Sequence, residues 1–159
     1  MLKRLKSQTG KATGGRFAIV ASEYNARYVD AMLRSARLEL KRAGAASIEV
    51  VRVPGAFEIP LAAARLVRMD SQWSAIICLG VILRGQTTHA QHIGEAVTLA
   101  LARLQIDYLV PMIHEVLLLE NAEQARMRCL DQKFNRGAEA ARTATKMAGV
   151  MKRLQALTE

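Results

Sequence analysis

The stretch SAIICLGVILRGQTTHAQHIGEAVTLALARL (74–104) places a strand, a loop and a helix in direct succession. Its first part, SAIICLG (74–80), is a short unbroken apolar run, as expected of a strand that is buried on both faces. The Gly- and Thr-rich segment 81–88 predicts a loop. The helix after it carries apolar residues at helical spacing, namely Ile93, Val97, Ala100 and Leu104. A buried strand that leads through a loop into an amphipathic helix is the repeating unit of a parallel sheet.

The same alternation continues on both sides of this stretch. Further strands are predicted at 16–21 (RFAIVA), 47–53 (SIEVVRV) and 109–118 (LVPMIHEVLL). Further helices are predicted from the polar break at 22–25 to about Gly44, and at about 58–69, 121–129 and 135–156. We therefore predict an α/β fold, a three-layer α/β/α sandwich around a four-stranded parallel sheet with right-handed crossovers. Ligands bind such sheets at the carboxyl ends of the strands.

Length and composition indicate one compact domain. The chain has 159 residues, of which 51% are hydrophobic, so a single core can form over residues 16–159. We expect residues 1–15 to form a basic, solvated arm. No apolar run approaches the roughly 18 residues that would span a bilayer. Cys78 and Cys129 show no disulfide pattern, which favours a reduced, cytoplasmic protein.

The formal net charge of +9 suggests an anionic partner. Lys and Arg residues are spread along the chain, and no basic motif is interleaved with aromatic residues that would stack on bases. A small molecule that carries phosphate fits this charge as well as a nucleic acid does. A basic nucleic-acid binder therefore stays as one functional class to test, and no sequence-specific nucleic-acid partner is predicted.

The loop Gly85-Gln86-Thr87-Thr88 has the composition of an anion-binding site. Glycine lets the backbone approach a ligand, and two hydroxyls precede a helix whose first amides have no helical partner. The alternative is that Thr88 serves as an ordinary helix N-cap. Both interpretations stay open from the loop alone.

His89 follows this loop, and an imidazole titrates near neutrality and can transfer protons. A lone loop histidine is more often structural, so its neighbours raise its interest. His89 and His92 also have a spacing that suits a metal, but no third ligand has convincing spacing. We therefore predict no metal.

Three other residues follow predicted strands or lie near them. Glu58 can accept hydrogen bonds from a polyhydroxyl ligand or complement a helix dipole. Tyr24 can stack on a flat heterocycle or fill a gap in packing. Arg128 can bind a phosphate bidentately or pair with a neighbouring carboxylate. Taken singly, each of these residues is better explained by the structural role than by the functional one.

Together these residues resemble the lumazine synthase family. The specific parts are VPGAFEIPLAA (53–63) and LGVILRGQTTH (79–89), and 120–125, Arg128 and Asn135-Arg136-Gly137 follow in the family's order. The resemblance implies a flavodoxin-like fold. It also implies the condensation of 5-amino-6-(D-ribitylamino)uracil with 3,4-dihydroxy-2-butanone 4-phosphate, the penultimate step of riboflavin biosynthesis. No metal or organic cofactor is implied.

The resemblance also implies roles for individual residues. His89 takes the position of the general acid/base, Tyr24 stacks on the pyrimidine, and Glu58 receives ribityl hydroxyls. The backbone of 81–83 reads the pyrimidine edge, and Arg128 completes the phosphate site. The expected substrate-binding set is Tyr24, Asn25, Ala56, Phe57, Glu58, Val81, Ile82, Leu83, Gln86, Thr87, Thr88, His114, Arg128 and Arg136.

Several positions depart from the family pattern. His114 and Glu115 replace a Phe-Gly pair, Leu118-Leu119 replaces a Thr pair, and Arg136 replaces a Lys that lies near the substrates. The resemblance implies that His114 reaches the active site of a neighbouring subunit. These changes motivate a second hypothesis, a member of the fold that binds flavin or lumazine without catalysis or acts mainly as a shell protein.

Family members form pentamers with active sites between subunits, and many assemble twelve pentamers into a shell of 60 subunits. We expect the same here, with a slight preference for the shell, and with riboflavin synthase as a candidate partner. The predicted last helix has apolar residues at steps of three and four. These residues can line a fivefold axis or pack on the helix's own sheet.

Overall fold

The computed structural model describes residues 14–70 and 72–158. The predicted basic arm falls mainly outside the described residues. Four strands form one parallel sheet in the order β2-β1-β3-β4. The strands are β1 (Arg16–Ser22), β2 (Ser47–Val53), β3 (Ala75–Leu83) and β4 (Met112–Leu119).

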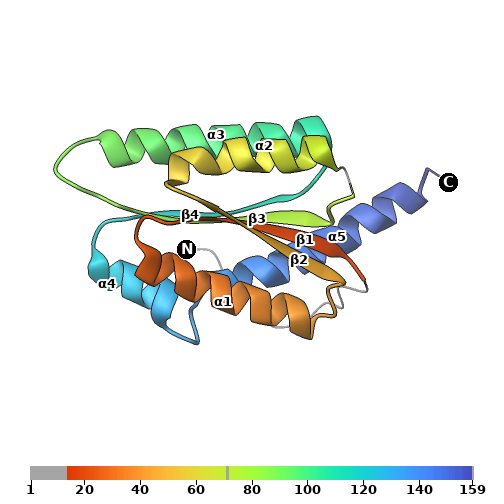
Figure 1. Cartoon of the computed structure of the whole chain (residues 1–159), viewed down its shortest axis with the longest axis horizontal. Helices are drawn as coiled ribbons and strands as arrows, with labels where there is room; N and C mark the ends of the chain where they lie inside the picture. The colour runs from red at the N-terminus through yellow and green to blue at the C-terminus, as the bar shows by residue number, and fades with distance from the viewer. Residues whose placement is uncertain (1–13, 71, 159) are drawn as a thin grey trace.

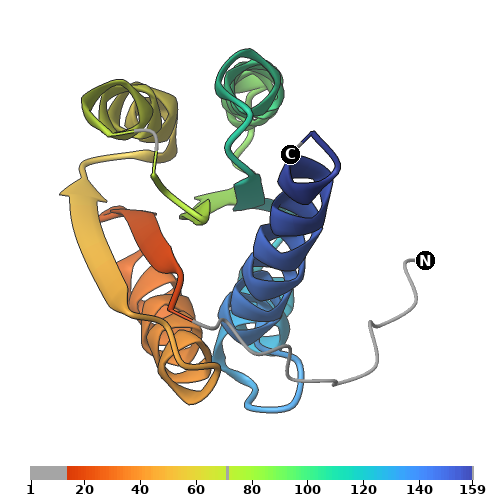
Figure 2. The ribbon, with the colours of Figure 1, turned by 90° about the vertical axis from the view of Figure 1, so that its right-hand side faces the viewer.

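Helices cover both faces of this sheet, as Figures 1 and 2 show. One layer contains α2 (Ile59–Met69) and α3 (His89–Tyr108), and the other contains α1 (Ala26–Arg42) and α5 (Arg136–Ala156). Short elements complete the chain, namely a 3₁₀ turn η1 (Ala56–Glu58), α4 (Ala122–Ala125) and a π-helical turn η2 (Arg126–Leu130). The predicted three-layer α/β/α, flavodoxin-like sandwich is confirmed. None of the helices described is long and apolar enough to cross a membrane.

The alternation of side chains along β1 divides the interior into two cores. Phe17 and Ile19 pack against the layer of α1 and α5, whereas Ala18 and Val20 pack against the layer of α2 and α3. All four side chains are fully buried. Burial of this kind contributes about 25 cal/mol per Å² of apolar surface and is the main force that holds the layers together.

Three element boundaries differ from the prediction. The strand predicted at 109–118 begins later, at Met112, because Leu109 ends α3 with a left-handed backbone. The segment 81–88 was predicted as a loop, but β3 continues to Leu83, and the loop is confined to 84–88. Gly80 does not end the strand. A Cβ there would lie 3.2 Å from side-chain atoms of Ile59 and Val116, so this glycine makes room for neighbours in the core. The helix predicted at 121–129 is shorter than expected and ends in the π-helical turn η2.

Candidate active site

A pocket of about 790 Å³ lies at the carboxyl ends of β1 and β3. Its walls come from the loop after β1, the turn after β2, the end of β3 and the first turns of α3, as the topology predicts. Nine of the residues expected at the site line it: Tyr24, Asn25, Ala56, Phe57, Glu58, Val81, Ile82, Leu83 and His89. Segments separated by up to 65 positions in the sequence thus meet in one cavity.

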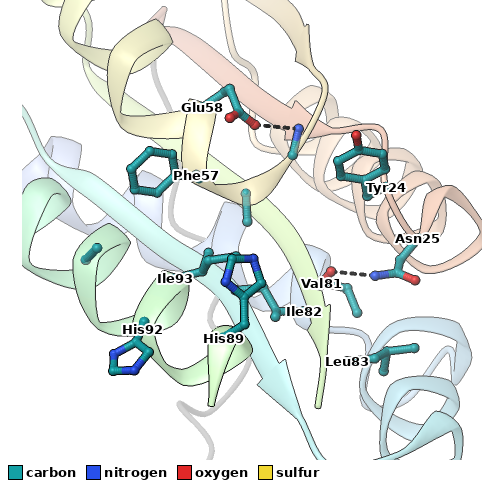
Figure 3. A pocket seen from close by; sticks show the side chains of 13 residues that line it. Tyr24, Asn25, Phe57, Glu58, Val81, Ile82, Leu83, His89, His92 and Ile93 are labelled. Carbon is teal, nitrogen blue, oxygen red and sulfur yellow. Dashed lines mark hydrogen bonds between the residues drawn. The ribbon is translucent and has the colours of Figure 1, made fainter. Parts of the chain in front are cut away.

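Asn25 fixes the loop after β1 against the end of β3. Its side-chain amide donates a hydrogen bond of 2.7 Å to the carbonyl oxygen of Val81 (Figure 3). Its backbone is left-handed, with φ of 59°, a conformation that asparagine tolerates better than most residues. Asn25 therefore has a structural role that holds Tyr24 beside the pocket.

The turn after β2 is held by Glu58. Its Oε2 accepts a hydrogen bond of 2.9 Å from the backbone amide of Gly55 (Figure 3). A Cβ on Gly55 would lie 2.8 Å from that carboxylate oxygen and 3.0 Å from the Tyr24 ring. Only glycine leaves both side chains in place. The other carboxylate oxygen of Glu58 makes no hydrogen bond within the described residues, so it is available to a ligand.

The two aromatic side chains of the pocket are largely open to solvent. Tyr24 is 69% exposed and Phe57 is 61% exposed, and their rings lie on two sides of the cavity in Figure 3. Apolar side chains of β3, Ile82 among them, form another part of the lining. Exposed rings over an apolar floor suit a flat, partly polar ligand.

His89 is the first residue of α3, and its imidazole reaches into the pocket (Figure 3). Its backbone amide approaches the Thr87 hydroxyl at 3.4 Å. The imidazole makes no hydrogen bond within 14–70 and 72–158, so both ring nitrogens are free for a ligand. Thr88 occupies the N-cap position, but its side chain caps no amide, so its hydroxyl has no established structural use.

The remaining expected residues lie outside this cavity. Gln86, Thr87 and Thr88 are exposed in the loop beside it. Arg128 is exposed on η2 and makes no ion pair within the described residues. His114 lies on β4 and Arg136 begins α5, and neither lines the pocket of its own chain.

His114 is held by two hydrogen bonds. The Thr98 hydroxyl donates its proton to the carbonyl oxygen of Gly94 at 2.7 Å, so it must accept from Nε2–H of His114 at 2.7 Å. Nδ1 of His114 then accepts from the backbone amide of Val116 at 3.2 Å. This pattern requires a neutral ring, and burial lowers the pKa of His114 accordingly.

Arg136 is bound to two carboxylates. Its Nε and Nη2 donate to the two oxygens of Glu115 at 3.0 and 2.9 Å, and Nη1 donates to Glu139 at 2.8 Å. The Glu115 side chain is only 8% exposed. Burial raises the pKa of Glu115 to about 7, although the guanidinium of Arg136 acts in the opposite direction. Two departures from the family pattern are therefore partners of one another.

Other residues line the pocket but were not in the expected set, namely Gly55, His92, Ile93 and Ala96. The last three lie three, four and seven positions after His89. Helical periodicity alone places them on its face, and this signal was available in the sequence. In the described part of the chain, no group of three or more His, Cys, Asp or Glu side chains is arranged to hold a metal ion.

Comparison with known proteins agrees with this geometry. Residues 14–152 match the family model of 6,7-dimethyl-8-ribityllumazine synthase. The chain belongs to the 6,7-dimethyl-8-ribityllumazine synthase family. The enzyme of that name from Stenotrophomonas maltophilia (strain R551-3) is 41% identical over 141 residues, which cover 87% of this chain and 90% of the relative. That from Xanthomonas campestris pv. campestris (strain B100) is 40% identical over 146 residues, or 91% and 94% of the two chains.

The region that matches the lumazine synthase family, residues 14–152, includes every residue that lines the pocket. It also covers Arg128 and Arg136, which lie outside the pocket of the single chain.

Proposed function

We propose that the chain catalyses the formation of 6,7-dimethyl-8-ribityllumazine from 5-amino-6-(D-ribitylamino)uracil and 3,4-dihydroxy-2-butanone 4-phosphate, the penultimate step of riboflavin biosynthesis. The proposal rests on the family match, which covers nearly the whole chain. Within the matched region, the pocket contains the free imidazole of His89 between aromatic walls. The reaction needs positioning and proton transfer, and the residues present can supply both.

We assign the roles in the pocket as follows. Tyr24 stacks on the pyrimidine, and the backbone of 81–83 binds its polar edge. The free oxygen of Glu58 accepts a ribityl hydroxyl, and Ala56 and Phe57 border that chain. Gln86, Thr87 and Thr88 contact the phosphate, for which Arg128 supplies a bidentate cation.

The proton transfers centre on His89. The 5-amino group of the uracil attacks the ketone, and loss of water gives an imine. A carbon–oxygen bond then breaks and inorganic phosphate leaves. The carbonyl that results condenses with the second nitrogen, with loss of another water, to close the ring. His89 accepts and returns protons at these steps next to the departing phosphate.

Assembly completes the site in this proposal, because no Lys or Arg among the described residues lines the pocket of a single chain. We infer that Arg128, His114 and the outer edge of Arg136 face the pocket of a neighbouring subunit in a pentamer, twelve of which form a shell. The outer side of α3 supports an interface, since Leu99 is 71% and Ile106 is 69% exposed. The last helix, by contrast, uses Ala140 and Ala144 to pack inside its own chain, where both are fully buried.

We also propose a cytoplasmic location, with riboflavin synthase as the partner that uses the product. Cys78 and Cys129 are free and buried. Burial raises their thiol pKa values to about 12 and about 11, so neither is set up for redox chemistry.

Purified protein mixed with both substrates tests the proposal through the absorbance of the lumazine. Product formation well above the rate without protein supports it. Binding of the uracil or of lumazine with no such acceleration would instead establish the non-catalytic alternative, which the changes at 114–119 motivate. Two of the changed residues, His114 and Glu115, make hydrogen bonds within their own subunit, and neither lines the pocket of its own chain.

A further inference from the structure

The outer side of α1 carries an excess of positive charge. The helix contains five cationic and two anionic side chains. Both carboxylates are occupied. Asp30 pairs with Arg52 of β2 at 2.6 Å, and Glu39 pairs with Arg42 at 3.2 Å and with Arg142 of α5 at 3.5 Å. The acidic residues of α1 therefore neutralise Arg42 and two cations of neighbouring elements, and not the other cations of α1.

Of the four cations on α1 that make no ion pair within the described residues, three lie together, while Arg27 lies near the start of the helix. Arg34, Arg37 and Lys41 are exposed, and none makes an ion pair or hydrogen bond within the described residues. Spacings of three, four and seven place them on one side of the helix. With Leu38 they line one surface hollow of about 370 Å³. We call Arg34, Arg37 and Lys41 the basic face.

Nearby cations extend this charge. Arg27 lies at one end of the same helix, where its guanidinium is 5.9 Å from the centre of the Tyr28 ring. The helix α5 lies beside α1 in the same layer (Figures 1 and 2), and its Lys146 and Arg153 are exposed with no ion pair in the described part of the chain. The field of this layer is therefore positive over a large area.

We propose that the basic face binds the phosphate backbone of nucleic acid without reading its sequence. From Arg27 to Lys41 the helix extends about 21 Å, and a DNA strand presents a phosphate about every 3.4 Å along its axis, so several phosphates fit along it. Among the described residues, those that line the hollow of the basic face include no aromatic or amide side chain that would select a base. The three cations of the basic face do not line the pocket, which lies at the carboxyl ends of β1 and β3.

Other anionic partners fit this face less well. A stable protein interface needs an apolar or aromatic centre, and among the described residues that line this hollow Leu38 is the one large apolar side chain. A helix that binds a membrane surface buries its apolar side in the lipid. The apolar side of α1, which includes Val29, Met32 and Leu40, is fully buried in the core.

The test compares two double variants that remove the same charge at the same spacing. One is Arg34→Gln with Arg37→Gln on the basic face. The other is Arg65→Gln with Arg68→Gln on α2, in the opposite layer. Binding to fluorescent DNA duplexes of about 20 base pairs, in two unrelated sequences, is measured by anisotropy at several salt concentrations.

We expect the unmodified protein to bind both duplexes with equal affinity. Each phosphate contact contributes about 0.9 to the slope of log Kd against log salt concentration, so the α1 variant, which lacks two arginines, should lose about 1.8 units of slope. The α2 variant should keep its slope. Equal losses in both variants would show that total charge alone binds DNA and would overturn the proposal. So would binding to anionic vesicles or polyglutamate in preference to DNA, or no binding at low salt.

Discussion

His89 and His92 form a natural pair for testing the chemistry at the level of the residue. Both line the pocket from the first turn of α3, and only His89 is assigned proton transfer. We expect His89→Ala to lower kcat by about 100-fold, the lower end of the range for general acid–base catalysis, because substrate positioning remains. KM values for both substrates should change little. His92→Ala is the matched control and should keep most of the turnover, whereas an equal loss in the two variants would contradict the assignment.

Arg128 and Arg136 should separate binding from stability. Arg128 is exposed and makes no ion pair within the described residues. Arg128→Ala should therefore leave the free energy of unfolding unchanged. It should raise KM for the butanone phosphate about tenfold, which corresponds to about 1.4 kcal/mol for a charge-assisted hydrogen bond. Steady-state kinetics with each substrate varied in turn checks this, and an effect confined to the uracil would place Arg128 elsewhere.

Arg136→Ala should act mainly on stability. It leaves the buried carboxylate of Glu115 without its bidentate partner, which should lower the free energy of unfolding by about 3 kcal/mol near neutral pH. Urea unfolding measures this quantity. If the Arg136→Ala variant were as stable as the Arg128→Ala variant, the ion pair between Arg136 and Glu115 would contribute nothing to the free energy of unfolding.

The same variant should depend on pH in a defined direction. Burial already raises the pKa of Glu115 to about 7 with Arg136 present, and loss of Arg136 removes an opposing influence. In the folded parent, Glu115 keeps up to about pH 7 a proton that the unfolded chain releases near pH 4.5, and in the variant it keeps that proton to a higher pH. The stability of both proteins should fall as pH rises towards 7, but only that of the variant should continue to fall above pH 7, so the deficit relative to the parent should be larger at pH 8 than at pH 5. A deficit that is constant with pH would contradict this account.

At the scale of elements, the sequence pattern predicts the order and type of nearly all strands and helices, because each has a clear period. The error at Gly80 has a physical cause. Glycine normally signals a turn, but here it relieves crowding between Ile59 and Val116, and this contact joins segments remote in sequence. The pairing of Glu115 with Arg136 was also beyond the pattern, since it joins a strand to a helix 21 positions later.

Packing between α1 and α5 depends on a single glycine. A Cβ on Gly137 would overlap the carbonyl group of Met32 on α1. Gly137→Ala should force the helices apart and lower the free energy of unfolding by about 3 kcal/mol or slightly less, as for an overpacked core.

Gly149, in the same helix, is the matched control. A Cβ there meets only the end of the Arg153 side chain, at 3.7 Å. Gly149→Ala should stabilise the chain by up to about 1 kcal/mol through helix propensity. Thermal unfolding of both variants measures the contrast, and destabilisation of similar size in the two would refute the close approach at Gly137.

For the whole molecule, the exposed side of α3 is the expected subunit interface. Leu99→Glu with Ile106→Glu should prevent assembly, because two charges would be buried in the contact. Light scattering should then show small species in place of pentamers or shells. Leu38→Glu, on α1, is the control and should leave the assembled mass unchanged. Assembly that survives the α3 double variant would place the interface on another surface.

Nine pocket residues were predictable, because the carboxyl ends of parallel strands always meet at one edge of a sheet. The positions of His114, Arg128 and Arg136 were not, since they lie outside the pocket of their own chain and the roles proposed for them involve a second subunit. The central claim concerns the pocket, and it is tested by measuring lumazine and inorganic phosphate together after the two substrates are mixed with the protein. We predict one phosphate released for each lumazine formed, at a rate that far exceeds the reaction without protein and that His89→Ala reduces. Formation of lumazine at the uncatalysed rate, or release of phosphate without lumazine, would contradict it.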